Sequence, residues 1–264
     1  MLYEGETAFQ KIQIFENAAL GRVLALDGIV QTTEADEFMY HEMLAHVPLF
    51  GYGTARRVLI IGGGDGGLLE EVLKHPIENV WMIEIDGEVV ELCRKHLSSI
   101  FGAAFEDLHA ELVIANGADY LAASDETFDL ILVDSTDPVG PEKVLFELPF
   151  YESCRAHLGA DGVLVTQNGV PFFQGDELSV TAANLNAVFA RSGFYVVPVP
   201  TYPGGVMTLG WASAGTDLAQ PDADLEARYE GAALETRDYT PAVHRAAFAL
   251  PEYVADLLAP RAPG

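Results

Sequence analysis

Residues 56–67 read RRVLIIGGGDGG, an apolar run of strand length that ends in a cluster of glycines. A helical pattern, LLEEVLKH, follows at 68–75, and a second apolar run, VWMIEID, follows at 80–86. Continuous apolar runs are typical of strands buried on both faces, and strands interleaved with helices indicate βαβ units. We therefore predict an α/β fold built on a mostly parallel, doubly wound sheet.

The pattern continues towards the carboxyl terminus. Further strands are predicted at 110–117, 128–135 and 162–169, and helices at 87–97, 150–158 and 177–193. Two late apolar runs, FYVVPVP at 194–200 and VMTLGWASA at 206–214, are predicted to form an antiparallel hairpin that closes the sheet. The Ala, Pro and Asp mixture at 214–225 favours a surface loop.

The first fifty residues have a different texture. Residues 9–38 alternate apolar and polar side chains and carry Asn-Ala and Asp-Gly turn signals, which predict short antiparallel strands. FMYHEMLAHVPLF at 38–50 has the apolar spacing of a helix. We therefore predict a small β domain with a linking helix at 1–50 and a catalytic α/β domain at 51–264.

The glycine cluster predicts a nucleoside site. Gly62, Gly64 and Gly67 satisfy G-x-G-x-x-G between a strand and a helix, where glycine lets the backbone approach a nucleotide closely. Glu84 ends the next strand, where a carboxylate binds ribose hydroxyls. Asp65, inside the loop, would repel the pyrophosphate of NAD. An adenosyl sulfonium carries positive charge and no phosphate, and a decarboxylated donor adds an ammonium tail that suits Asp65.

A second acidic cluster follows the strand at 128–135. Asp134 ends this strand and Asp137 lies in the next loop, so both are expected to face the crevice at the carboxyl edge of the sheet. A diamine is protonated near neutral pH, and one of its nitrogens must lose a proton before it attacks carbon. We predict Asp134 as the general base and Asp137 as an orienting partner. Asx-turns that serve only structure are the alternative for this segment.

Composition narrows the class of protein. The chain has 14 Lys+Arg against 40 Asp+Glu, a formal net charge of −26, which argues against nucleic acid as a partner. Such a charge attracts polycations, but it is also the mark of an acidic proteome and does not identify a substrate. There is no signal-peptide pattern and no apolar stretch of membrane-spanning length. Cys93 and Cys154 stand apart, and the seven histidines show no metal-ligand spacing. We predict a soluble, cytoplasmic protein without a metal, membrane contact or disulfide.

The sequence resembles the polyamine aminopropyltransferase family, particularly bacterial spermidine synthases. The resemblance rests on GGGDGG, YHEM, VDSTDPVGP, QNGV, PTYPGG and VHRAAFALPEY, and it covers almost the whole chain. It implies a small N-terminal β domain followed by a Rossmann-like domain of the class I methyltransferase type, assembled as a homodimer or homotetramer. It also implies transfer of the aminopropyl group of decarboxylated S-adenosylmethionine to putrescine, with no cofactor.

The resemblance assigns roles to residues that patterns alone do not. On the donor side it implies contacts from Gln10, Glu84, Asn116, Gly117 and Pro141. On the aminopropyl and polyamine side it implies that Asp134 accepts the proton with Tyr40 beside it, and that the remaining contacts come from His41, Asp65, Ser135, Thr136, Asp137 and Tyr202.

The chain departs from the family pattern at a few positions. Asn116 stands where the family has Asp, Ala35 and Glu70 stand where it has cationic side chains, and Thr240 stands where it has Asn. The chain also starts later than the resemblance leads us to expect, because the first strands of relatives have no counterpart before Met1.

Other functions share parts of this pattern. An S-adenosylmethionine-dependent amine methyltransferase would need the glycine loop and Glu84 but not Asp65 or the pair Asp134 and Asp137. A polyamine-binding protein without catalysis is a second alternative. For an aminopropyltransferase the acceptor stays open among putrescine, cadaverine and agmatine, because one methylene discriminates by only about 1–3 kcal/mol.

Overall fold

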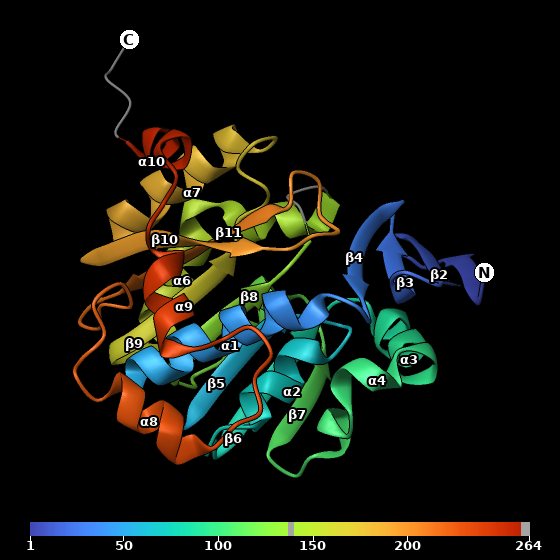
Figure 1. Ribbon diagram of the computed structural model, residues 1–264, viewed down its shortest axis with the longest axis horizontal. Coiled ribbons are helices and arrows are strands. Elements are labelled where there is room, and N and C mark those ends of the chain that lie inside the picture. Colours follow the sequence, from blue (N-terminus) through green and yellow to red (C-terminus); the bar gives the residue numbers. More distant parts are fainter. Residues whose placement is uncertain (137–139, 260–264) are drawn as a thin grey trace.

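The computed structural model describes residues 1–136 and 140–259 and contains a large and a small β-sheet (Figure 1). The large sheet has seven strands in the order β10-β11-β9-β8-β5-β6-β7. Its five parallel strands are β5 (Arg57–Gly62), β6 (Asn79–Glu84), β7 (Ala110–Ile114), β8 (Phe128–Asp134) and β9 (Leu158–Gln167). The predicted Rossmann-like sheet is therefore confirmed.

The sheet ends in the predicted antiparallel hairpin. β11 (Val206–Ser213) pairs antiparallel with β9, and β10 (Arg191–Pro198) pairs antiparallel with β11. The helix expected at 177–193 is shorter, since α7 (Gly175–Val188) ends five residues earlier. Arg191 already pairs with Ser213, so the full length of β11 draws this part of the chain into the sheet.

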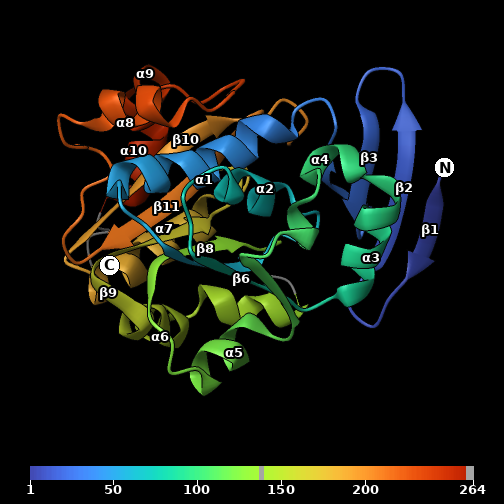
Figure 2. The ribbon, with the colours of Figure 1, turned by 90° about the horizontal axis from the view of Figure 1, so that it is seen from below.

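Helices cover both faces of the large sheet (Figure 2). In β5, Val58 and Ile60 face one layer while Leu59 and Ile61 face the other, as the two-residue repeat of a strand requires. The first layer contains α1 (Glu37–Tyr52), α2 (Gly67–Leu73), α8 (Leu225–Ala232) and α9 (Pro241–Ala247). The second contains α5 (Gly117–Ala123), α6 (Leu148–His157), α7 and α10 (Glu252–Leu258).

The small sheet is a four-stranded antiparallel meander of β1 (Tyr3–Glu6), β2 (Lys11–Asn17), β3 (Gly21–Leu26) and β4 (Ile29–Thr33). Asp27 and Gly28 have φ of 48° and 81° in the β3–β4 turn, which fits the predicted Asp-Gly hairpin. Its apolar face packs against α3 (Gly87–His96) and α4 (Ser98–Phe101). Two short 3-10 helices, η1 (Ala104–Glu106) and η2 (Gly140–Phe146), complete the described elements.

Helix α1 is the element that joins the two sheets. It follows β4 directly, yet it packs against α2 and the core of the large sheet. The division of the chain near residue 50 stays a prediction. Among the described residues, no helix combines the length and the apolar character needed to cross a membrane. Cys93 and Cys154 are both buried and not bonded to each other.

Candidate active site

The site lies where β5 and β8 run side by side. The chain continues from β5 to β6 on one side of this pair and from β8 to β9 on the other, so the carboxyl ends open at a topological switch point. Gly62 pairs with Asp134, and the Gly63 N–H donates to the Asp134 carbonyl oxygen at 3.0 Å. Gly62 has φ of 86°, and a Cβ there would collide with that carbonyl oxygen. Glycine is therefore required, and it brings the loop against the end of β8.

Asp134 receives a hydrogen bond from helix α1. The Tyr40 hydroxyl donates to Asp134 Oδ1 at 2.7 Å across 94 residues of sequence. Burial raises the pKa of Asp134 to about 6, the charge of Asp65 adds to the rise, and His41 and Tyr40 oppose it. The structure thus brings the predicted base together with Tyr40, and the carboxyl group is ionised at neutral pH while still basic.

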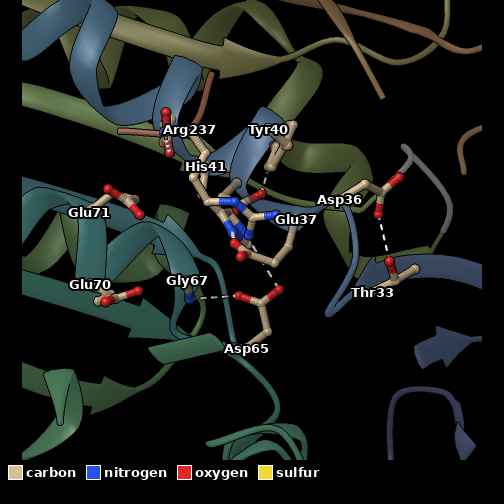
Figure 3. A network of polar contacts seen from close by, with 12 residues as sticks. Thr33, Asp36, Glu37, Tyr40, His41, Asp65, Gly67, Glu70, Glu71 and Arg237 are labelled. Atoms are coloured by element: carbon tan, nitrogen blue, oxygen red, sulfur yellow. Dashed lines mark hydrogen bonds and ion pairs between the residues drawn. The ribbon is translucent and has the colours of Figure 1, made fainter. Parts of the chain in front are cut away.

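Asp65, in the loop after β5, contacts His41, the residue that follows Tyr40 on α1 (Figure 3). Its Oδ2 lies 3.5 Å from His41 Nε2, and its Oδ1 accepts from the Gly67 N–H at 2.9 Å. The other ring nitrogen of His41, Nδ1, lies 2.8 Å from Glu37 Oε2. Burial alone raises the pKa of Asp65, but the charge of His41 and the hydrogen bonds from His41, Gly67 and Thr32 together outweigh burial, and the pKa is lowered. Asp65 is therefore a buried, ionised carboxylate.

A second corner of the site forms at the end of β6. Glu84 is buried and its Oε1 accepts from the Asp86 N–H at 2.9 Å. Burial raises the pKa of Glu84 to about 7. Gln10 from the small sheet reaches this corner, where its Nε2 donates to Asp86 Oδ2 at 3.2 Å. A Cβ at Gly64 would lie 3.1 Å from Glu84 Oε2, so the glycine loop and Glu84 bound one space.

The opposite end of the site is held by Asp36. Its Oδ1 accepts from the Thr33 hydroxyl at 2.6 Å, and its Oδ2 accepts from the N–H and hydroxyl of Thr201 at 3.0 and 2.7 Å. One residue further, the Tyr202 hydroxyl donates to the Gln31 carbonyl oxygen at 2.6 Å. The side chains of this end surround a small cavity lined by Gln31, Thr32, Asp36, Glu37, Tyr40, His41, Val199 and Tyr202.

The other predicted residues have more varied positions. Asn116 caps α5, and its Oδ1 accepts from the N–H groups of Ala118 and Asp119 at 2.9 and 3.2 Å. Because that oxygen already accepts two hydrogen bonds, the side-chain NH₂ group is the part of Asn116 that remains to hydrogen-bond to a nucleobase. Gly117 begins α5, where a Cβ would collide with Ile61.

The residues after β8 are only partly described. Ser135 and Thr136 are partly buried, and Ser135 Oγ has no hydrogen-bond partner among the described residues. Pro141 lies in η2, but its side chain is outside what the structure describes. Asp137 lies outside the described residues, so its predicted place beside Asp134 is not tested.

Sequence reasoning missed Asp36, Glu37 and Asp86. Each is close in sequence to a residue that was predicted, but its function in the site comes from partners 4 to 165 positions away. The available signals were the adjacent acidic pair in TEADEF and, for Glu37, its spacing of four residues from His41. Within residues 1–136 and 140–259, no cluster of three His, Cys, Asp or Glu side chains is arranged to hold a metal ion.

Two of the positions that depart from the family pattern, Thr240 and Glu70, make local contacts. The Thr240 hydroxyl caps α9 by accepting from the Val243 N–H at 3.1 Å. Glu70 is half-buried on α2, and its carboxylate lies 3.8 Å from Lys74 Nζ. Nothing in the described contacts explains Ala35.

A parallel sheet with a glycine loop, a carboxylate at the end of β6 and two more carboxylates at the β5–β8 switch point defines a Rossmann-like protein with an acidic candidate site at the carboxyl edge of the sheet. The sequence profile of the spermine/spermidine synthase domain matches residues 37–220, and that of the spermidine synthase tetramerisation domain matches residues 1–34. The chain belongs to the spermine/spermidine synthase family.

Individual relatives agree along nearly their whole length. Polyamine aminopropyltransferase 1 of Pseudomonas aeruginosa is 52% identical over 256 residues, which cover 96% of this chain and 90% of the relative. The polyamine aminopropyltransferase of Ruegeria sp. is 50% identical, with coverage of 97% and 91%. A crystal structure of a spermidine synthase in complex with the transition state analogue AdoDATO has a TM-score of 0.93 and 43% identity, with coverage of 97% and 87%. Spermidine synthase from Thermotoga maritima has a TM-score of 0.91 and 43% identity, with coverage of 97% and 86%.

Proposed function

We propose that this chain is a spermidine synthase, which transfers the aminopropyl group of decarboxylated S-adenosylmethionine to putrescine and releases spermidine and 5'-methylthioadenosine. The observation that carries the proposal is the convergence of Asp65, Glu84 and Asp134 at one edge of the parallel sheet. The charge of Asp65 raises the pKa of Asp134, and the charge of Asp134 adds to the burial that raises the pKa of Glu84. Three coupled carboxylates suit a donor and an acceptor that are both cations.

Each end of the donor has a matching group. Glu84 accepts hydrogen bonds from the ribose hydroxyls, while the glycine loop lets the backbone approach the nucleoside. Gln10 lies at the same corner through its contact with Asp86. Asp65 binds the ammonium group of the aminopropyl chain. Asn116, Gly117 and Pro141 border the adenine in this proposal.

The transfer itself needs one proton acceptor. The Asp134 carboxylate takes a proton from one amine of the diamine, and the freed nitrogen attacks the carbon next to sulfur. A C–N bond forms, the C–S bond breaks, and the sulfonium leaves as a neutral thioether, so most of the catalysis is positioning and exclusion of water. Tyr40 orients Asp134. The contacts to the rest of the polyamine come from His41, Ser135, Thr136, Asp137 and Tyr202.

The wider setting of the enzyme is part of the proposal. We expect a homodimer or homotetramer, supported by the tetramerisation profile at residues 1–34. The reaction uses no cofactor or metal, because the donor is a co-substrate, and we expect it to run in the cytoplasm. Cadaverine and agmatine are the alternative acceptors, since they differ from putrescine only in length or at the far end.

The test is direct. Purified protein is incubated with decarboxylated S-adenosylmethionine and, separately, putrescine, cadaverine or agmatine, and methylthioadenosine and the polyamine product are quantified by chromatography. We expect spermidine from putrescine as the fastest product. Methyl transfer from S-adenosylmethionine to the same amines would support the methyltransferase alternative, and binding of both substrates without product would support a non-catalytic binder.

A further inference from the structure

His41 is buried between two carboxylates that come from different elements. Its Nδ1 lies 2.8 Å from Oε2 of Glu37, one turn earlier on α1, and its Nε2 lies 3.5 Å from Oδ2 of Asp65 in the loop after β5 (Figure 3). Only 3% of the His41 side chain is exposed, and Glu37 and Asp65 are exposed by 14% and 11%. Both contacts are therefore largely shielded from water.

This geometry selects the charge of the imidazole. A neutral imidazole has one N–H, so its second nitrogen would direct a lone pair at a carboxylate oxygen. Only the imidazolium donates to both Glu37 and Asp65. Burial by itself lowers the pKa of His41, but the charges and hydrogen bonds of Asp65 and Glu37 outweigh it, and the pKa lies well above its ordinary value.

Further polar groups near the ring include Tyr40 on the same helix, Asp134 at the end of β8 and Glu70 on α2. All the charged groups among them are acidic. Among these groups His41 is therefore the cation that neutralises Asp65.

A substrate ammonium changes this balance. The proposed function brings the ammonium of the aminopropyl chain to Asp65, so two cations would meet at one buried carboxylate. His41 can become neutral by releasing the proton on Nε2, while its Nδ1–H continues to donate to Glu37. The Nε2 lone pair then accepts an N–H from the arriving ammonium, and Asp65 accepts another.

We propose that Glu37 is a positioning residue that holds His41 with Nδ1 protonated, so that His41 releases its Nε2 proton when a substrate ammonium binds at Asp65 and then accepts a hydrogen bond from it. This inference rests on the proposed function for the identity of the ammonium. One N–H bond of the imidazolium breaks, and the proton passes to bulk water. The ammonium keeps its own three protons, so the charge beside Asp65 is the same before and after binding.

The test compares a ligand that carries this ammonium with one that lacks it. Decarboxylated S-adenosylmethionine carries the ammonium and a sulfonium charge, and 5'-methylthioadenosine has the same nucleoside with neither. At about pH 8 Asp134 is already ionised, so the sulfonium charge has no proton to displace from it. Binding of each is measured by titration calorimetry without diamine, at about pH 8, in Tris and in phosphate, whose ionisation enthalpies differ. The dependence of the heat on the buffer gives the number of protons released. We expect close to one more proton per site for the decarboxylated donor than for methylthioadenosine.

Three variants locate the proton. His41→Gln should abolish the difference between the two ligands, because no ionisable ring remains. Glu37→Gln keeps an acceptor for Nδ1–H but removes a charge, so His41 is largely neutral beforehand and the difference should fall to half or less. Glu70→Gln is the matched control, since it removes an acidic charge nearby without a hydrogen bond to the ring, and the difference should persist. Methylthioadenosine binding reports that each variant is folded.

The outcomes separate this inference from the proposed function. If the protein forms methylthioadenosine from donor and putrescine, yet both ligands release equal numbers of protons, the inference is overturned and the function stands. An unchanged difference in His41→Gln also overturns it. If the protein neither binds the decarboxylated donor nor forms product, the proposed function fails and the inference fails with it.

Discussion

Helix α1 carries two buried histidines, and their surroundings differ. His41 lies at the site between the carboxylates of Glu37 and Asp65. His46, behind the site, shares one carboxylate with its neighbours. Its Nε2 lies 3.1 Å from Glu71 Oε2, which belongs to the carboxylate that also binds Lys74 at 2.6 Å, and its Nδ1 lies 2.9 Å from His75 Nε2.

The two clusters show that burial alone does not set the charge of an imidazole. Around His41, the two carboxylates both contact one ring and hold it as a cation. Around His46, burial lowers the pKa of His75 to about 3 and the charge of His46 adds to the effect, so His75 is neutral. Among buried imidazoles, the number of carboxylates available per cationic side chain decides whether the ring is charged. The cluster around His41 suits exchange of charge with a ligand, and the cluster around His46 suits permanent packing.

The largest effect is expected on kcat, at Asp134 in the candidate active site. Asp134→Asn removes the proposed proton acceptor, and we expect kcat to fall about 10³-fold while methylthioadenosine binding is retained. Asp129→Asn is the control, because Asp129 lies near the other end of β8 and accepts from the N–H groups of Arg56 and Arg57. Steady-state kinetics on both variants test the assignment. A normal kcat in Asp134→Asn would place the base elsewhere.

The next effect is expected on stability, at Glu42 on α1. Glu42 is buried, and its carboxylate accepts from the N–H groups of Arg237, Asp238 and Tyr239 at 2.7, 2.8 and 2.7 Å. Glu42→Ala leaves these donors without their acceptor, so we expect the free energy of unfolding to fall by about 3 kcal/mol. Urea denaturation measures this, with Glu91→Ala as the control because Glu91 is 72% exposed. Equal losses in the two variants would show that the Glu42 contacts contribute little.

A smaller effect is expected at Tyr40. Tyr40→Phe removes the hydrogen bond to ionised Asp134, and we expect kcat/KM to fall about tenfold. The bond favours the charged carboxylate, so its loss raises the pKa of Asp134 above about 6 and moves the acidic limb of the rate profile to higher pH. Tyr52→Phe is the control, since Tyr52 lies on the same helix but donates to Asp129, near the other end of β8, at 3.2 Å. A limb that stays in place would mean that Asp134 does not set it.

The last prediction concerns the pH dependence of stability at His75. Because its pKa is about 3 in the folded protein and about 6.5 unfolded, the unfolded chain binds more protons between these values and stability falls as the pH falls through that window. His75→Gln should remove up to about 1.4 kcal/mol per pH unit from this dependence. Urea denaturation between about pH 4 and 7 gives the slope. An unchanged slope would mean that His75 is not neutral in the folded protein.

The sequence predicts the large sheet well because its strands are continuous apolar runs. The runs in β5 and β8 end in residues with only a few physical uses, glycine in a tight loop and aspartate at a strand end, so Gly62, Asp65 and Asp134 could be found without a structure. β1 was missed because YEGE has no apolar alternation. The end of α7 was missed because pairing with β11, and not local propensity, stops the helix.

Most of the rest of the site could not be predicted because its contacts are distant in sequence. The spacing of four residues between Glu37 and His41 on one helix indicates that they can meet, but nothing local indicates that His41 also meets Asp65. Asn116 illustrates the same limit, since its oxygen caps α5 and only the fold reveals that this atom is occupied.

Asp36 has a consequence for how the small sheet is connected to the cavity. Asp36 lies just before α1, and its carboxylate accepts hydrogen bonds from Thr33 at the end of β4 and from Thr201, the residue before Tyr202. One side chain therefore links three segments. The small sheet is therefore connected to the cavity beside Tyr40 and His41 by two links, the Asp36 carboxylate and the hydrogen bond from the Tyr202 hydroxyl to the Gln31 carbonyl oxygen.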